Sequence, residues 1–206
     1  MKAWCVRLLL AWLASSAAGC ASAPIHYYTL SPPMERAPGV SAGSPTIDLR
    51  LVNVPPQLDR VDLLIRTGPT EVTLLENERW ASPLKDEIKD ALRLELQRRL
   101  VRAAASSRAF ATLTLDIDVR RFEAEIGRYA HLEASWRATV SDAGKPSIGE
   151  QVADCTFQAD EQISAGYAGM VEGYQRAVAA LADAIVVALT GAAGNEDAGC
   201  ATPLRG

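Results

Sequence analysis

Short segments in which hydrophobic and polar residues alternate mark the predicted strands. In the first, from 46 to 54, isoleucine and leucine alternate with aspartate and arginine, and this period of two predicts a half-buried strand. Two shorter β-rich segments follow at 61–67 and 70–76, on either side of the turn pair Gly68-Pro69. The chain up to residue 76 is therefore predicted to contain three strands.

A period of four then replaces the period of two. Leucine or isoleucine recurs at 84, 88, 92, 96 and 100, with basic residues mostly on the other faces, which predicts an amphipathic helix. Ser82 is able to cap its free N–H groups, and Pro83 suits the first helical position. Helical spacing returns between Tyr174 and Leu189, where Asp183 argues against a membrane span.

Three further strands are predicted between the two helices. The segments 113–119 and 130–140 alternate strictly and predict a long antiparallel hairpin, and Ala153, Cys155 and Phe157 share one face of a third segment. The order is three strands, a helix, three strands and a helix. It predicts an α+β two-layer sandwich, in which an antiparallel or mixed sheet carries both helices on one face.

Composition narrows the class of protein. The 206 residues are 49% hydrophobic and 22% charged, with a formal net charge of −4, which excludes wholesale disorder and fits one main domain. No run of lysine and arginine offers the positive stripe that nucleic acids require. His26 and His131 have no neighbouring ligands at metal-site spacing, so no metal site is expected.

The N-terminus has the features of an export signal. Lys2 and Arg7 precede an apolar run of 11 residues, Leu8 to Ala18, which covers about half of a bilayer core and is typical of a signal peptide. The run closes with Ala17-Ala18-Gly19-Cys20, which resembles the lipobox of bacterial lipoproteins. The resemblance implies diacylglycerol and an acyl chain on Cys20, and two or more chains give stable anchoring. The alternative is an ordinary cleaved signal.

The chain is accordingly divided into four segments. They are a signal peptide at 1–19, a lipid anchor and tether at 20–45, the α+β domain at 46–190 and a flexible tail at 191–206. The residue after Cys20 is Ala21 rather than aspartate, and the resemblance to enterobacterial lipoproteins therefore implies the outer membrane rather than retention in the inner membrane. Cys155 and Cys200 would then face an oxidising periplasm, where they either form a disulfide or remain a buried thiol and a free thiol.

Groups that would support catalysis are few. The sequence lacks the common nucleophile-elbow, phosphate-loop and zinc-protease motifs, and no enzyme is predicted. His131 is either a base or an ordinary exposed strand residue, and Asp116 and Asp118 are either a carboxylate pair or part of a solvated face. Trp80 either packs on the first helical turn or anchors a partner.

Several stretches, in this order and spacing, resemble the bacterial ABC-type transport auxiliary lipoproteins over roughly residues 27–189. The stretches that carry the resemblance are Tyr27-Tyr28-Thr29-Leu30, Val54-Pro55-Pro56, Glu78-Arg79-Trp80-Ala81-Ser82-Pro83-Leu84, Arg121-Phe122-Glu123 and Leu132-Glu133-Ala134-Ser135-Trp136.

The resemblance implies a non-enzymatic outer-membrane lipoprotein of an intermembrane lipid transport system. Its expected partners are an MCE-domain protein anchored in the inner membrane, outer-membrane lipid and further copies of itself. No cofactor is expected beyond the lipid on Cys20, and Tyr27, Tyr28 and Trp80 are candidate partner-binding residues. The alternatives are a periplasmic lipoprotein that binds a ligand or peptidoglycan, and a lipid-modifying hydrolase that uses His131 or the aspartates.

Overall fold

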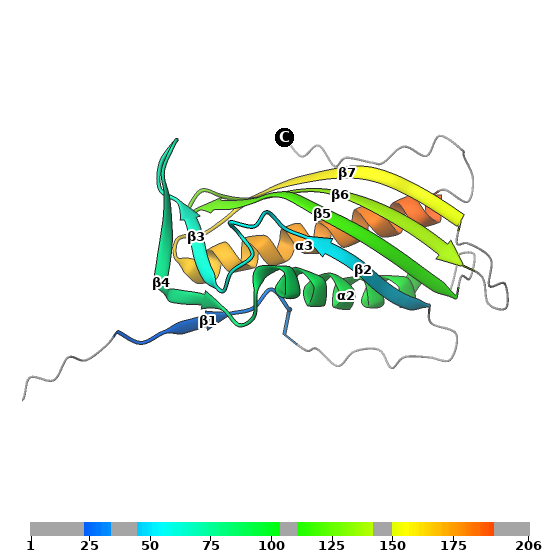
Figure 1. Cartoon of the computed structure of the whole chain (residues 1–206), viewed down its shortest axis with the longest axis horizontal. Helices are drawn as coiled ribbons and strands as arrows, with labels where there is room; N and C mark the ends of the chain where they lie inside the picture. Colours follow the sequence, from blue (N-terminus) through cyan, green and yellow to red (C-terminus); the bar gives the residue numbers. More distant parts are fainter. Residues whose placement is uncertain (1–22, 34–44, 104–110, 142–149, 192–206) are drawn as a thin grey trace, which may run out of the picture.

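The computed structural model describes residues 23–33, 45–103, 111–141 and 150–191. They form seven strands and two helices, and the α+β prediction is confirmed (Figure 1). The elements are β1 (His26–Tyr28), β2 (Thr46–Asn53), β3 (Asp62–Arg66), β4 (Val72–Trp80), α2 (Leu84–Ala103), β5 (Thr112–Glu125), β6 (Tyr129–Ser141), β7 (Glu150–Gln162) and α3 (Tyr167–Gly191).

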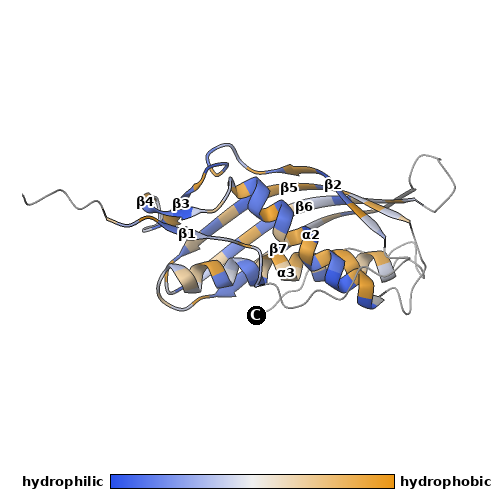
Figure 2. Ribbon diagram, turned by 90° about the horizontal axis from the view of Figure 1, so that it is seen from below, coloured by the Kyte–Doolittle hydropathy of each residue, from blue (hydrophilic) through white to orange (hydrophobic). Residues whose placement is uncertain are grey.

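The larger sheet has four strands in the order β2-β5-β6-β7. β5, β6 and β7 are antiparallel as predicted, whereas β2 runs parallel to β5. Both helices lie along one face of this sheet, with their apolar sides turned toward it (Figure 2). The alternating residues of the hairpin fill the layer between them, because Leu115, Ile117, Leu132 and Trp136 are all at most 3% exposed.

A second sheet of three strands, in the order β1-β4-β3, lies at one end of the larger sheet (Figure 1). The sequence patterns predicted a single sheet, and the division into two is a correction. β3 and β4 pair with each other rather than with β2, and the register of β4 is interrupted between Leu75 and Arg79. Alternation predicts the faces of strands but not their partners, so it could not reveal this division.

Both helices are core helices. Ile88, Leu92 and Leu96 of α2 and Leu181 and Ile185 of α3 are completely buried. By length and composition alone, α3 would pass for a membrane span from Tyr167 to Thr190. Its apolar residues are explained by packing on the sheet and on α2, which agrees with the prediction made from Asp183.

A short strand lies within the segment predicted to be the tether. β1 lies within the segment 20–45, and the nearby Leu30 is only 1% exposed. A strand of three residues is too short to show a period, and its stability depends on pairing with β4. The folded body therefore begins at about His26. The predicted signal peptide, Cys20, Cys200 and the tail after 191 lie outside the described residues.

Candidate functional site at the anchor-proximal end

The three-stranded sheet and the start of α2 form the end of the domain next to the N-terminus, called here the anchor-proximal end. β1 pairs in parallel with the last residues of β4, His26 opposite Glu78 and Tyr28 opposite Trp80. Glu78 accepts a hydrogen bond of 2.7 Å from the Tyr28 hydroxyl, and its other oxygen lies 3.0 Å from His26 Nδ1. These contacts fix β1 to the domain.

The same contacts shift the titration of both partners. Burial, and then the hydrogen bond to the Glu78 carboxylate, raise the pKa of Tyr28 to about 12. Burial alone would raise the pKa of Glu78, but the hydrogen bonds from Tyr28 and His26 outweigh it and lower that pKa below 4.5. The ionised Glu78 and the neutral Tyr28 are therefore the forms that hold β1 at neutral pH.

Glu87 connects the segment after β1 to the first turn of α2. One of its oxygens accepts hydrogen bonds of 3.0 and 2.9 Å from the backbone N–H and hydroxyl of Ser82. The other accepts bonds of 2.8 Å from the Thr29 hydroxyl and from the Leu30 N–H. The residue is only 5% exposed, so this carboxylate is buried with four donors around it. The sequence pattern of α2 could not reveal these contacts, because Thr29 and Leu30 are 58 and 57 positions away from Glu87.

Trp80 belongs to the core, which corrects its assignment as a candidate partner-binding residue. It is 4% exposed and packs against Phe122 and Tyr174, with ring centroids 6.3 and 6.1 Å away. Phe122 and Tyr174 stack at 3.8 Å. Tyr28 is half-buried against this core, whereas Tyr27 is 64% exposed. Of the three aromatic candidates, only Tyr27 presents most of its surface to solvent.

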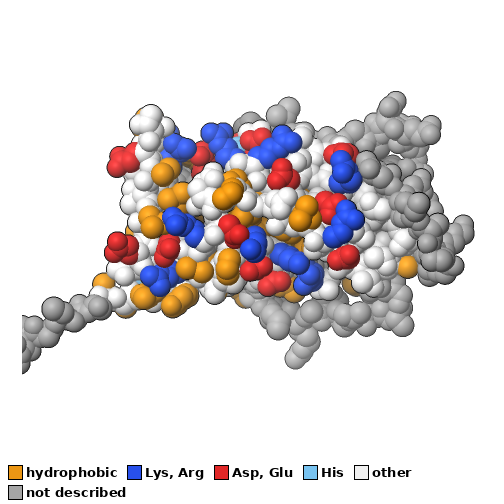
Figure 3. Space-filling view, viewed as in Figure 1, with side chains coloured by type: hydrophobic (Ala, Val, Ile, Leu, Met, Phe, Trp, Pro, Cys, Tyr) orange, Lys and Arg blue, Asp and Glu red, His pale blue; other side chains and the backbone are white. Residues whose placement is uncertain are grey.

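Exposed apolar side chains concentrate at the anchor-proximal end. The described residues include seven large hydrophobic side chains that are exposed, and five of them lie in or beside the small sheet. These five are Ile25, Tyr27, Val61, Val72 and Leu74. Figure 3 shows hydrophobic side chains gathered over this end, with charged side chains among them. Such a concentration is typical of a surface that contacts a partner or lipid.

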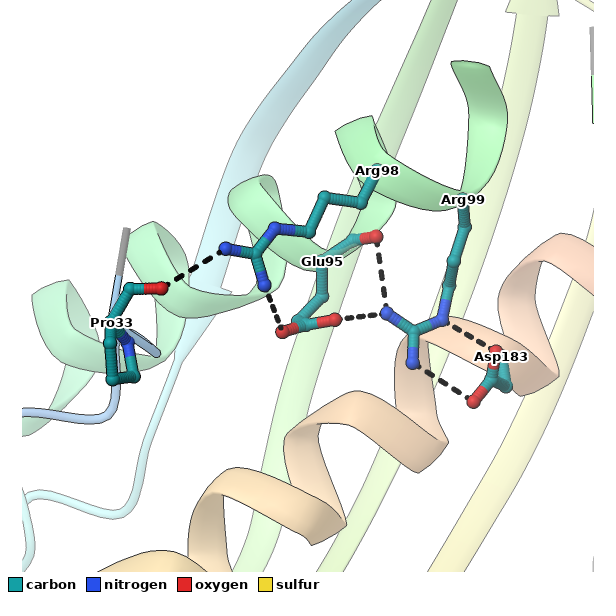
Figure 4. A network of polar contacts seen from close by, with 5 residues as sticks. All are labelled: Pro33, Glu95, Arg98, Arg99 and Asp183. Carbon is teal, nitrogen blue, oxygen red and sulfur yellow. Dashed lines mark hydrogen bonds and ion pairs between the residues drawn. The ribbon is translucent and has the colours of Figure 1, made fainter. Parts of the chain in front are cut away.

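A polar network fixes the segment after β1 to the helical layer (Figure 4). Arg99 of α2 donates hydrogen bonds of 2.5 and 3.0 Å to the Asp183 carboxylate of α3, and it also pairs with Glu95. Arg98 lies 3.6 Å from Glu95 and donates to the Pro33 carbonyl at 3.4 Å. The hydrogen bonds to Asp183 are the main cause that raises the pKa of Arg99. The network therefore joins α2, α3 and the N-terminal segment.

The candidate catalytic groups do not form a site. His131 was expected to be an exposed strand residue, but it is 4% exposed, and its Nδ1 lies 2.7 Å from Asp160. The Arg50 guanidinium donates two hydrogen bonds to the Asp116 carboxylate, and the one from Nε measures 2.9 Å. Asp118 is exposed. Within the described ranges, no three His, Cys, Asp or Glu side chains come together to hold a metal ion.

Cys155 is buried on β7 at 4% exposure and takes part in a disulfide. Its predicted partner Cys200 lies outside the described residues, so the pairing of these two cysteines stays a prediction. Nearby, β7 and α3 border a groove of about 440 Å³ with a floor of Ala159, Ala180 and Ala184. We call it the β7–α3 groove.

Comparisons with known proteins agree with this arrangement. The chain is 28% identical over 134 residues to the intermembrane transport lipoprotein PqiC of Escherichia coli, a match that covers 63% of this chain and 68% of the relative. PqiC of Shigella flexneri matches equally. A crystal structure of an uncharacterised protein, 17% identical, covers 81% of this chain and 99% of its own with a TM-score of 0.62, and so shares the fold.

The family comparison covers most of the folded body. The family model described as the ABC-type transport auxiliary lipoprotein component matches residues 28–186, from the last residue of β1 nearly to the end of α3. The match includes Tyr28, Glu78 and Glu87, the residues that join β1 to the rest of the domain. This chain therefore belongs to the ABC-type transport auxiliary lipoprotein family.

Proposed function

We propose that the protein is the outer-membrane lipoprotein of an MCE-type intermembrane lipid transport system, in which it docks the periplasm-spanning partner and supports membrane integrity. The observation that carries the proposal is the family match over residues 28–186, together with the similarity to PqiC, a lipoprotein named for intermembrane transport. In this proposal the protein binds the partner and holds it in position, since the exposed groups at the anchor-proximal end are apolar and ionic side chains rather than a catalytic cluster.

The short distance between Cys20 and β1 supports a body held close to the bilayer. His26 is six positions after Cys20, and six extended residues span at most about 20 Å. The hydrogen bonds of Glu78 and Glu87 prevent the segment from His26 to Leu30 from extending this reach. The anchor-proximal end is therefore expected to face the membrane, and the partner has to approach the membrane to dock.

Three measurements test this function. Cys20→Ser should move the protein from the outer-membrane fraction to the soluble periplasm, and intact-mass analysis of the native protein should show the added acyl groups. Cross-linking in living cells followed by purification of the lipoprotein should recover an MCE-domain protein. Continued fractionation of Cys20→Ser with the outer membrane would contradict the anchor, and repeated failure to recover an MCE protein would contradict the docking role.

The β7–α3 groove favours a second candidate, a periplasmic lipoprotein that binds a small ligand or peptidoglycan. Its volume of about 440 Å³ lies in the range of small-molecule sites. The two functions differ in oligomeric state, because a docking protein is expected to form a stable oligomer and a simple ligand-binding protein a monomer. Light scattering after size exclusion of the purified lipoprotein separates them.

A further inference from the structure

A second cavity lies between the two sheets and is called here the inter-sheet crevice. It encloses about 220 Å³ between β3 of the small sheet, β5 of the large sheet and the loop that contains Pro55 and Leu58. Leu58, Leu64 and Phe122 are among its apolar lining residues. Its charged lining residues are Arg66, Arg120, Arg121 and Glu123. The crevice therefore combines an apolar floor with a basic rim.

A β-bulge creates this basic rim. Val119 pairs with Ala134 and Arg121 pairs with Glu133, so that Arg120 has no partner residue across the strands. Val119 and Phe122 are both buried on the inner face, so the two residues between them both point outward. Regular alternation would have placed one of these arginines in the core. Bulges that redirect side chains are common next to functional sites.

The rim keeps an excess of positive charge. Three arginines and one glutamate line the crevice, which leaves a formal charge of 3 − 1 = +2. The Glu123 carboxylate already accepts hydrogen bonds from the Arg66 guanidinium at 2.7 Å and from the Tyr129 hydroxyl at 3.2 Å. The Nε of Arg121 lies 3.6 Å from the same carboxylate. Arg120 is exposed and has no ion pair within the described ranges. An anion that entered the crevice would therefore meet Arg120 and Arg121 without having to displace a tight ion pair.

An apolar strip leads out of the crevice across the small sheet. Leu64 pairs with Leu74 and Arg66 with Val72 across β3 and β4, and directly opposed residues of an antiparallel pair lie on the same face. Leu64 and Val72 line the crevice, while Val72 is 53% and Leu74 39% exposed. The crevice thus has a basic rim, and Val72 and Leu74 beside it expose apolar surface. Inorganic phosphate would use only the first of these features, whereas a phospholipid would use both.

We infer that the inter-sheet crevice binds the phosphate-bearing head of an anionic phospholipid. Arg120 and Arg121 contact the phosphate, Arg66 completes the basic rim, and the acyl chains leave over Leu64, Val72 and Leu74. The volume suits a head group rather than a whole lipid, because sites for complete small molecules usually exceed about 300 Å³. The inference rests on the proposed function, since it names the lipid class that a protein of lipid transport would meet at its membrane-facing end.

The test uses the mature chain with Cys20→Ser and isothermal titration calorimetry. The probes are dihexanoyl phosphatidylglycerol below its micelle concentration and, separately, inorganic phosphate. Saturable binding of the phospholipid, with inorganic phosphate at least about tenfold weaker, is expected. Arg120→Ala with Arg121→Ala should weaken phospholipid binding about tenfold or more, because charge-assisted contacts to phosphate are lost. Leu74→Ser should weaken the phospholipid but leave inorganic phosphate unchanged.

Arg93→Ala is the matched control, since Arg93 is a partly exposed arginine on α2 that does not line the crevice. It should bind the phospholipid like the parent chain. The absence of saturable binding, or equal binding by the double arginine variant, would overturn the site. Equal affinity for inorganic phosphate would overturn the lipid assignment and leave a simple anion site. These outcomes are independent of the cross-linking result, which reports on docking to the MCE protein and does not require the crevice.

Discussion

The Glu87 carboxylate accepts a hydrogen bond of 2.8 Å from the backbone N–H of Leu30, although the two residues are 57 positions apart. The contact joins the N-terminal segment with the first turn of α2. Because the same carboxylate also holds Ser82, one buried side chain sets the position of β1 relative to the helical layer.

Glu87→Gln should destabilise the domain by about 2 kcal/mol, because an amide cannot accept from four donors and leaves at least one buried donor unpaired. The free energy of unfolding in urea measures the effect. Asp90→Asn is the control, since Asp90 is 63% exposed on the same helix and should change stability by less than about 0.5 kcal/mol. Similar effects for the two variants would contradict the assigned role of Glu87.

Trp80→Ala should cost about 3–5 kcal/mol, because it opens a cavity beside Phe122 and Tyr174. Tyr27→Ala should stay within about 0.5 kcal/mol, since Tyr27 is mostly exposed. Thermal unfolding followed by circular dichroism compares the two variants. If Tyr27→Ala proved as destabilising as Trp80→Ala, the contrast between a core tryptophan and a surface tyrosine would be wrong.

Acidification should destabilise the domain through Glu123. Burial would raise the pKa of Glu123, but the hydrogen bond from Arg66 and the nearby charge of Arg121 outweigh it and lower the pKa below 4.5. A carboxyl whose pKa is lower in the folded state stabilises the protein above its unfolded pKa, and this contribution is lost as the pH falls through the folded pKa.

Glu123→Gln should therefore be less stable than the parent chain at pH 7, and the difference should shrink as the pH falls below about 4.5. Urea unfolding between pH 3 and 7 measures both curves. Glu125→Gln, two residues along the same strand face, is a suitable control, because among the described residues Glu125 forms an ion pair only with the exposed Arg128. A constant difference between parent and Glu123→Gln over the whole range would exclude a contribution from this titration.

Cys155 and Cys200 should form one disulfide in the exported protein, since Cys155 is disulfide-bonded and Cys200 is the remaining cysteine of the predicted domain and tail. Alkylation without reductant, followed by mass spectrometry, should label neither residue. Cys200→Ser should lower the free energy of unfolding by about 2–4 kcal/mol. Reductant should produce a similar loss in the parent chain and none in Cys200→Ser, and a reductant-sensitive Cys200→Ser variant would show that Cys155 has another partner.

Local patterns were sufficient for the two helices and for the faces of most strands. The four-residue period of α2 and the alternation in β5 and β6 indicate which side chains are buried. The pattern is visible within each segment because the side chains that face the core are apolar and recur at the period of the helix or strand. Pro83 marked the start of α2 to within one residue, whereas the Ser82 hydroxyl donates to the Glu87 carboxylate instead of capping an N–H group. The aromatic candidates were less well resolved, because an isolated tryptophan has the same appearance in a sequence whether it packs inward or contacts a partner.

Pairing between distant segments was decided only when the chain folded. β1 is too short to have a period, and it forms because it pairs with β4, where Glu78, 50 positions away, also bonds Tyr28. His131 alternates onto the outer face as expected, yet it is buried beside Asp160. Arg66 and Arg121 meet at Glu123 because a bulge and a sheet boundary coincide there. The period of a segment shows which of its residues face the core. These contacts depend instead on which segments become neighbours, and the packing of the whole domain determines that.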